Sequence, residues 1–284
     1  MRRALAILPM IFAAWTAIAA PAAKPSHIMS LNLCTDQLLL MMLPPERITS
    51  LSFLSRASEK PLFSAEAAGL PVNYGTLEEV LAQKPDLVIA GTASTPTTRA
   101  FLAASNIPLV EVPLANDFES IRTTTRQVGR AVGEKEKAES LIAQMDATLA
   151  ELAATAPQRR IVVAAWGGGG EVPGRGTLFD AILTAAGGTN VAATLPSARF
   201  GVFDFEELLV SHPDIIAFPD AAMDHPGLRR EQIQHRVIEK LYRGRQIAYP
   251  EALVGCGLPQ SADAARDLRR AMLAIMDREG TAPP

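Results

Sequence analysis

The chain has little of several residue types that mark whole classes of protein. Only 2 of its 284 residues are cysteine and 5% are aromatic, and 27 basic and 30 acidic side chains leave a net charge of −3. Two cysteines exclude a disulfide-dense scaffold and a cysteine-rich zinc module. The lack of a basic excess argues against a nucleic-acid partner. With 48% hydrophobic residues the chain is too apolar to be disordered, and its length predicts one or two domains.

The first 22 residues have the pattern of a secretory signal peptide. Two arginines follow the first Met, an Ala-rich apolar stretch extends to Ile18, and Ala20-Pro21-Ala22 fits a small-residue cleavage site. An uncleaved membrane anchor is the alternative. No later segment offers 18 consecutive apolar residues, so no spanning helix is predicted after it. We therefore expect an exported protein from which residues 1–22 are removed.

Two segments repeat one pattern, at residues 77–90 and 205–218, an offset of 128 residues. Each copy reads as a short amphipathic helix, a Pro-Asp break and a continuous apolar strand. Thr76 and Asp204 are each followed three residues later by Glu, which is the pattern of a capping box at a helix start. A proline then ends each helix. The strands lack alternation, as expected for a parallel sheet covered on both faces.

Strands and helices are predicted to alternate in both halves of the chain. The predicted strands are 28–33, 47–51, 86–91, 107–112, 160–166, 214–219 and 245–249, and the predicted helices are 36–43, 77–84, 97–105, 177–187, 205–211, 227–241 and 261–278. This order predicts an α/β protein of two Rossmann-like, parallel-sheet lobes, at 23–133 and 156–284. Apolar residues at helical spacing after Gly133 predict one long connector helix at 134–155.

The loops that follow the strands should line a cleft between the lobes, because parallel sheets bind ligands beyond the carboxyl ends of their strands. The side chains in these loops that suit a ligand are Asn32, Cys34, Arg56, Tyr74, Trp166, Arg175, Arg199 and Phe200. The arginines would neutralise an anionic ligand, and the aromatic rings would pack against a flat one. The alternatives are solvent-facing loop arginines and a tryptophan that packs in the core.

The two cysteines, Cys34 and Cys256, fall on strand-end loops in different lobes. One hypothesis is a disulfide across the margin of the cleft, which would limit opening of the lobes. The other is two reduced thiols, since a Cα separation above about 7 Å prevents bonding. The common nucleotide, metalloprotease and hydrolase motifs do not occur, and neither catalytic residues nor a metal site are predicted. An exported α/β enzyme acting through Cys34 on a small substrate is the alternative to a binding protein.

The segments HIMSLNLCTDQLLLMM, LEEVLAQKPDLVIAG and FEELLVSHPDIIAF, with the signal peptide and the connector helix, carry a resemblance. Together they resemble the iron-siderophore and cobalamin class of periplasmic ABC-transporter substrate-binding proteins, to which vitamin B12-binding proteins belong. The resemblance implies the class III periplasmic binding protein fold and a monomer that binds a metal chelate between its lobes, without a cofactor. It also implies a periplasmic location and delivery of the chelate to an ABC permease dimer at the inner membrane.

The resemblance further implies docking on the permease through one surface glutamate per lobe. The matching positions are Glu78 and Glu206, for which a solvated helix face is the alternative. A ferric siderophore is the first expectation for the ligand, with cobalamin or another corrinoid next. Haem would need an axial side chain, for which Tyr74 and Cys34 are the candidates.

Overall fold

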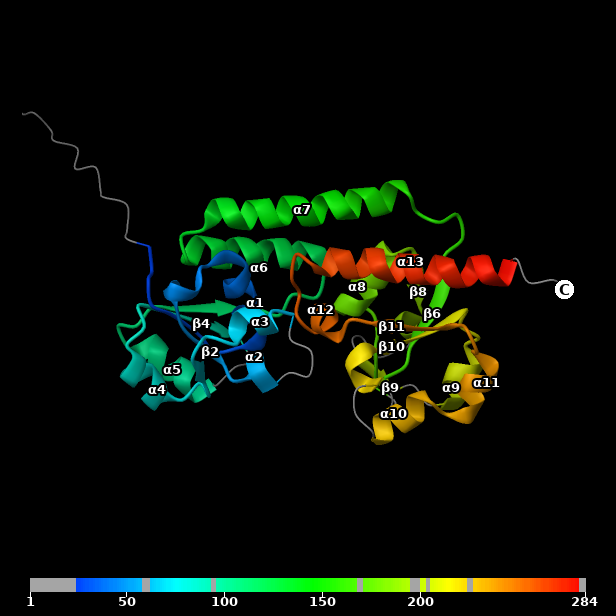
Figure 1. Ribbon diagram of the computed structural model, residues 1–284, viewed down its shortest axis with the longest axis horizontal. Coiled ribbons are helices and arrows are strands. Elements are labelled where there is room, and N and C mark those ends of the chain that lie inside the picture. Colours follow the sequence, from blue (N-terminus) through cyan, green and yellow to red (C-terminus); the bar gives the residue numbers. More distant parts are fainter. Residues whose placement is uncertain are drawn as a thin grey trace, which may run out of the picture.

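Two parallel β-sheets form the centres of two lobes, and the long helix α7 (Lys135–Ala154) spans both of them (Figure 1). This arrangement is that of a computed structural model, which describes residues 24–57, 62–92, 96–167, 171–194, 200–202, 205–223 and 227–280. The predicted signal peptide, Arg199 and the predicted helix cap Asp204 lie outside these ranges.

The first lobe contains β1 (Ile28–Ser30), α1 (Leu33–Met42), β2 (Ile48–Ser52), α2 (Leu54–Ala57), α3 (Ser64–Ala67), β3 (Val72–Asn73), α4 (Leu77–Gln83), β4 (Leu87–Gly91), α5 (Pro96–Ala104), β5 (Leu109–Val112) and α6 (Phe118–Ala131). After α7, the second lobe contains β6 (Ile161–Ala165), β7 (Glu171–Pro173), α8 (Leu178–Ala185), β8 (Gly188–Asn190), β9 (Phe200–Val202), α9 (Phe205–Val210), β10 (Ile215–Pro219), α10 (Leu228–Ile233), α11 (Arg236–Leu241), β11 (Gln246–Tyr249), α12 (Glu251–Gly255) and α13 (Ser261–Gly280).

The two main sheets have matching topologies. The first has the strand order β3-β2-β1-β4-β5, and the second has the order β8-β6-β10-β11, with parallel pairing throughout. The strands of the internal repeat, β4 and β10, therefore occupy the same place beside the first strand of each lobe. A small antiparallel pair, β7 with β9, is added to the second lobe. The predicted α/β class and the two parallel-sheet lobes are confirmed.

The helix ends of the repeat share an unusual backbone conformation. Lys84 and His212 both have positive φ, 48° and 45°, and each precedes the proline that ends its helix. At the start of α4, Thr76 and Glu79 form the predicted capping box. Because proline disfavours the helical conformation in the residue before it, the chain leaves each helix sharply and enters the following strand.

The aspartate after each of these prolines ties the helix end to the first strand of its lobe. The carboxylate of Asp86 accepts a hydrogen bond from the amide of His27, 3.0 Å away, just before β1. The carboxylate of Asp214 accepts one from the amide of Val162 in β6, at 2.8 Å. The Pro-Asp pair in the sequence thus aligns the central strands in both lobes.

Helix α7 buries one face, as its predicted periodicity requires, and packs against α6 and α13. One hydrophobic cluster extends through both lobes and includes Ile121 of α6 and Cys256 after α12. At the junction, a Cβ atom on Gly257 would lie 2.5 Å from the Cβ of Ala115. The absence of a side chain at residue 257 therefore allows the second lobe to approach the first closely.

Each predicted strand occurs, with slightly different bounds, and so do the predicted helices. The helix expected at 227–241 is wrong in one respect: it is two helices, α10 and α11, because His235 begins a new helix by accepting a hydrogen bond from the amide of Val237. The short elements β3, β7, β8, β9, α2, α3 and α12 were not predicted. Within the described ranges, no helix has the length and apolarity that crossing a membrane requires.

Candidate functional site

An exposed aromatic pair lies at the carboxyl ends of two neighbouring strands in the first lobe. Phe53 directly follows β2, and Tyr74 directly follows β3, which pairs with β2 at the edge of the sheet. Their ring centroids are 5.1 Å apart with planes at 20°, so the rings stack. Phe53 is 38% exposed and Tyr74 is 65% exposed. The pair presents a flat aromatic surface at the edge where a parallel sheet binds its ligands.

The backbone beneath the pair is held by buried polar side chains. The amide group of Asn73, which is fully buried, donates to the carbonyl oxygens of Ser30 and Leu51 and to the hydroxyl of Ser50, each at 2.9 Å. Its oxygen accepts a hydrogen bond from the amide of Gly75 at 3.1 Å. Asn73 therefore ties the segment that carries Tyr74 to β1 and β2.

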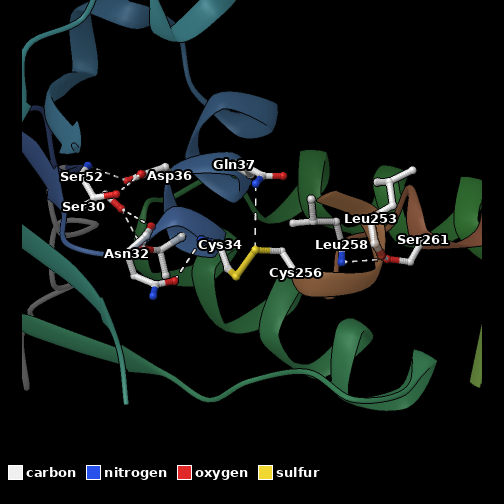
Figure 2. The surroundings of a disulfide bond; sticks show 11 residues. Ser30, Asn32, Cys34, Asp36, Gln37, Ser52, Leu253, Cys256, Leu258 and Ser261 are labelled. Atoms are coloured by element: carbon white, nitrogen blue, oxygen red, sulfur yellow. Dashed lines mark hydrogen bonds between the residues drawn. A yellow bond between two sulfur atoms is a disulfide. The ribbon is translucent and has the colours of Figure 1, made fainter. Parts of the chain in front are cut away.

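Asp36 holds the segment that carries Phe53. Its fully buried carboxyl group accepts hydrogen bonds from the backbone amide of Ser52, at 3.0 Å, and from the hydroxyl of the same residue (Figure 2). Burial raises the pKa of Asp36 to about 7, although the hydrogen bonds from Ser30 and Ser52 oppose that increase. A buried carboxyl group without a cationic partner is unusual, and this one is bonded to the residue that directly precedes Phe53.

A cavity of about 130 Å³ lies where the two lobes meet. Its wall carries no charged side chain and consists of Asn32, Cys34, Thr35, Leu38, Gly91, Thr92, Val112, Pro113, Leu114, Ala115, Thr124 and Gly257. The side chain of Asn32 caps α1 by accepting from the amide of Cys34 at 2.9 Å. Ligand pockets usually measure about 300–1,000 Å³, so this cavity suits one substituent of a bulky ligand rather than the whole of it.

A disulfide joins Cys34, in the first turn of α1, to Cys256, which directly follows α12 (Figure 2). Their Cα atoms are 5.2 Å apart, within the usual range for a disulfide. Of the two hypotheses, the bonded pair is therefore the one that the structure contains. The bond links the lobes at the margin of the cavity. A sulfur atom in a disulfide is neither a nucleophile nor an axial ligand, which removes Cys34 from both roles.

The predicted arginines are bonded within their own lobe. Arg56 donates to the carbonyl oxygens of Ala68 and Leu70, and Arg175 donates through two nitrogen atoms to the carbonyl oxygen of Ala193. Both guanidinium groups thus hold loops in place, a role the sequence did not predict. Contact of these side chains with a ligand stays a prediction. Arg199 and the side chain of Phe200 lie outside the described part of the chain.

The prediction that Trp166 forms a platform in the cleft is wrong. Only 5% of Trp166 is exposed, and its ring packs in the core of the second lobe, edge-on to Phe205. Its indole nitrogen donates to the carbonyl oxygen of Gln232 at 3.3 Å. The reason is that β6 is an inner strand whose end is covered by α9 and α10. Phe53 was missed, although the rule that selected Tyr74, a position directly after a strand, also applies to it.

The two predicted docking glutamates occupy equivalent positions of the repeat. Glu78 lies in the first turn of α4 and Glu206 in the first turn of α9, and both are exposed. Figure 1 shows α4 and α9 in different lobes, on the side of the molecule away from α7. Within the described ranges, no three His, Cys, Asp or Glu side chains are grouped so as to hold a metal ion. Of the two candidates for an axial bond with haem iron, Cys34 and Tyr74, the exposed Tyr74 stays a prediction.

Comparison with known proteins gives a consistent result. The family model described as periplasmic binding protein matches residues 53–240. A curated cobalamin-binding protein of Halobacterium salinarum (strain ATCC 29341 / DSM 671 / R1) is 27% identical over 201 residues, which cover 68% of this chain and 53% of that protein. The chain therefore spans about half the length of the curated relatives it matches.

Solved structures show the same fold. The periplasmic heme-binding protein RhuT from Roseiflexus sp. RS-1, in its apo form, has a TM-score of 0.69 and 24% identity, over 88% of this chain and 98% of that one. The periplasmic vitamin B12 binding protein BtuF of Vibrio cholerae has a TM-score of 0.70 and 15% identity, over 89% and 98% of the two chains. The predicted class III fold is confirmed by this likeness.

Proposed function

Because the chain belongs to the periplasmic binding protein family, we propose that it is the solute-binding component of an ABC importer. The protein captures a metal chelate between its lobes as a monomer and delivers it to a membrane permease. Family and fold are those of binding proteins rather than enzymes. The chelate is a planar tetrapyrrole, either a corrinoid or haem, and the protein is exported after removal of residues 1–22.

The stacked pair of Phe53 and Tyr74 is the observation that carries this choice of ligand. A flat, exposed pair of rings suits a flat, largely apolar macrocycle, which gains free energy from stacking and from burial of its surface. The small uncharged cavity at the lobe junction suits one substituent of that macrocycle. The similar proteins are named as binding cobalamin, heme and vitamin B12, which supports the same ligand class.

A ferric siderophore, the first expectation from the sequence, fits less well. Ferric catecholate complexes carry more negative charge than haem with its propionates, so their recognition would need more free guanidinium groups. Both described arginines of the predicted set, Arg56 and Arg175, donate to backbone carbonyls instead. Exposed apolar side chains also follow strands of the first sheet: Leu54, next to Phe53 in the chain, is 37% exposed, and Leu114, after β5 at the opposite edge, is 58% exposed.

Titration of the purified mature protein tests this function. Cyanocobalamin, haemin and a ferric tris-catecholate complex are added separately, and the absorption of the ligand and the heat of binding are measured. We expect saturable, one-to-one binding of a tetrapyrrole. Phe53→Ala and Tyr74→Ala should each weaken it about tenfold, the value of one lost ring stack. Binding of the catecholate complex alone would refute the ligand class, and binding of none of the three would refute the function.

Phe101→Ala is the matched control for these variants. Phe101 is 39% exposed, about the same as Phe53, but lies on helix α5 rather than at a strand end. Its replacement should leave affinity unchanged. Tyr74→Phe tests whether the phenol oxygen is the axial ligand of haem iron. If it is, the absorption spectrum of bound haem should change in this variant, while the affinity for cyanocobalamin stays the same.

Docking on the permease is assigned to Glu78 and Glu206. Their exposure on equivalent helices of the two lobes suits contact with a pseudo-symmetric partner. The double variant Glu78→Lys/Glu206→Lys should bind ligand normally but fail to stimulate the permease. Glu136→Lys, an exposed substitution in the first turn of α7, is the control. Unchanged stimulation by the double variant would remove the assignment.

A further inference from the structure

The aromatic pair is joined to a buried ionisable group through a short series of contacts. Asp36 accepts two hydrogen bonds from Ser52, the last residue of β2. Phe53 follows directly, and its amide donates to the carbonyl oxygen of Asn73 at 2.8 Å. The ring of Phe53 stacks on Tyr74. A displacement of Ser52 would therefore move one ring of the pair and alter the stack.

The surroundings of Asp36 leave its charge without compensation. The groups that face its carboxyl are the hydroxyls of Ser30 on β1 and Ser52 on β2 and the amide of Ser52. Among the described residues, no charged side chain contributes to its pKa, whether from α1 itself or from the strands and helices packed against α1. Figure 2 shows the carboxyl group of Asp36 hydrogen-bonded to Ser52, with Ser30 nearby.

We propose that Asp36 is a positioning residue for the pair of Phe53 and Tyr74, and that it makes ligand binding weaker above neutral pH. This inference rests on the proposed function, since it takes the aromatic pair as the ligand-contacting surface. The arrangement seen here has the carboxyl group fully buried, which favours its protonated form. Ionisation favours a rearrangement in which the carboxylate reaches water, and Ser52 must then move with Phe53.

The pKa of about 7 sets the range of this effect. If the arrangement seen here binds the ligand and requires a protonated Asp36, affinity should fall by about tenfold from pH 6 to pH 8. Asp36→Asn keeps a neutral side chain of the same shape, whose oxygen can accept from the Ser52 amide and whose nitrogen can donate to the hydroxyl. Affinity of that variant should be independent of pH and equal to that of the wild type at pH 6.

The test is a titration with cyanocobalamin or haemin, whichever binds, at pH 6, 7 and 8, with wild type, Asp36→Asn and Asp86→Asn. Asp86→Asn is the control. The carboxylate of Asp86 lies in the same lobe and also accepts backbone hydrogen bonds, but from Ser26 and His27 rather than from Ser52. Comparison of variants with one ligand cancels titration of the ligand itself. The affinity of Asp36→Asn should not change with pH. The affinity of Asp86→Asn should change with pH as that of the wild type does. The proposal would be overturned if the affinity of the wild type did not change with pH, or if the affinity of Asp36→Asn fell with pH as much as that of the wild type.

Amide hydrogen exchange without ligand separates this proposal from the function. If no tetrapyrrole binds, the proposed ligand class fails, and the positioning role is judged on the amides of Ser52 and Phe53. From pH 6 to pH 8 their protection in the wild type should fall relative to the amide of Val88, which donates to the carbonyl of Pro108 in the same lobe. Constant relative protection would overturn the role. This comparison needs only the wild-type protein, so it stands even if Asp36→Asn does not fold.

Discussion

Arg269 on α13 is 6% exposed, yet its guanidinium group is fully engaged. It donates to the carbonyl oxygens of Leu152, Ala185 and Ala186 and to the hydroxyl of Thr155. These carbonyls belong to the last turns of α7 and α8, where a helix leaves its acceptors without partners. The positive charge also suits the negative ends of both helix dipoles, and burial lowers the pKa of Arg269.

Arg269→Leu should therefore lower the free energy of unfolding by about 3 kcal/mol, because several buried carbonyl groups lose their donor. Urea unfolding followed by circular dichroism measures the loss. Arg270→Gln is the control, since that side chain is 73% exposed and pairs with Asp267 in the same helix turn. Equal effects of the two substitutions would contradict the structural role of Arg269.

Asp36 should make the stability of the fold depend on pH. Its pKa is about 7 in the fold against an ordinary 3.8, so the folded protein binds more protons than the unfolded chain between these values. The stabilising contribution is complete below pH 4 and is lost as the pH rises to 7. The thermal midpoint of the wild type should fall relative to that of Asp36→Asn between pH 5 and pH 7.5. A constant difference would contradict the assigned pKa shift.

For single residues, the sequence predicts which side chains follow a strand better than it predicts which of them are exposed. Tyr74 and Trp166 both follow a strand directly, and the same rule predicted a ligand contact for each. The structure separates them because β3 is an edge strand, which leaves Tyr74 uncovered, whereas β6 is an inner strand whose end is covered by helices. Neither the place of a strand in its sheet nor the packing of distant helices can be obtained from local spacing.

Among the elements, those with strong local patterns were predicted well. The internal repeat fixed α4 with β4 and α9 with β10, because caps, proline breaks and apolar runs are local in sequence. The three-residue strands β7, β8 and β9 were missed, since so short a segment has no periodicity to detect. They form only when the surrounding lobe supplies a partner strand.

The turn after α12 brings the lobes together at Gly257. A Cβ atom there would lie 2.8 Å from the carbonyl oxygen of Ala115 and 3.1 Å from a side-chain carbon of Ile121. Gly257→Ala should lower the free energy of unfolding by about 2 kcal/mol, because the lobes must separate to admit the methyl group. Urea unfolding measures this effect, with Gly255→Ala as control, where nothing lies within 4 Å. An unchanged stability of Gly257→Ala would contradict the close approach.

In the described part of the molecule, the lobes are joined by α7, by the continuous hydrophobic cluster and by the disulfide between Cys34 and Cys256. The sequence predicted the connector helix from its periodicity and left the disulfide open, because bonding depends on a distance that only the packed lobes set. A bond at the junction restrains separation there. We therefore expect ligand entry to need only small opening motions.

The disulfide closes a loop of 222 residues, which by the chain-entropy model contributes up to roughly 5 kcal/mol to stability. The variant Cys34→Ser/Cys256→Ser should unfold at lower urea concentration than the oxidised wild type. Dithiothreitol should lower the midpoint of the wild type and leave that of the variant unchanged. A wild-type midpoint that does not respond to the reductant would show that the bond does not stabilise the fold.

We propose that a planar metal chelate binds on the aromatic pair of Phe53 and Tyr74. The most direct measurement is a titration of cyanocobalamin and haemin into the wild type and into the variant Phe53→Ala/Tyr74→Ala, followed by ligand absorption. We predict saturable one-to-one binding in the wild type and a loss of more than about tenfold in the double variant, which removes both rings together. Equal affinity of the two proteins, or no saturable binding by the wild type, would contradict the claim.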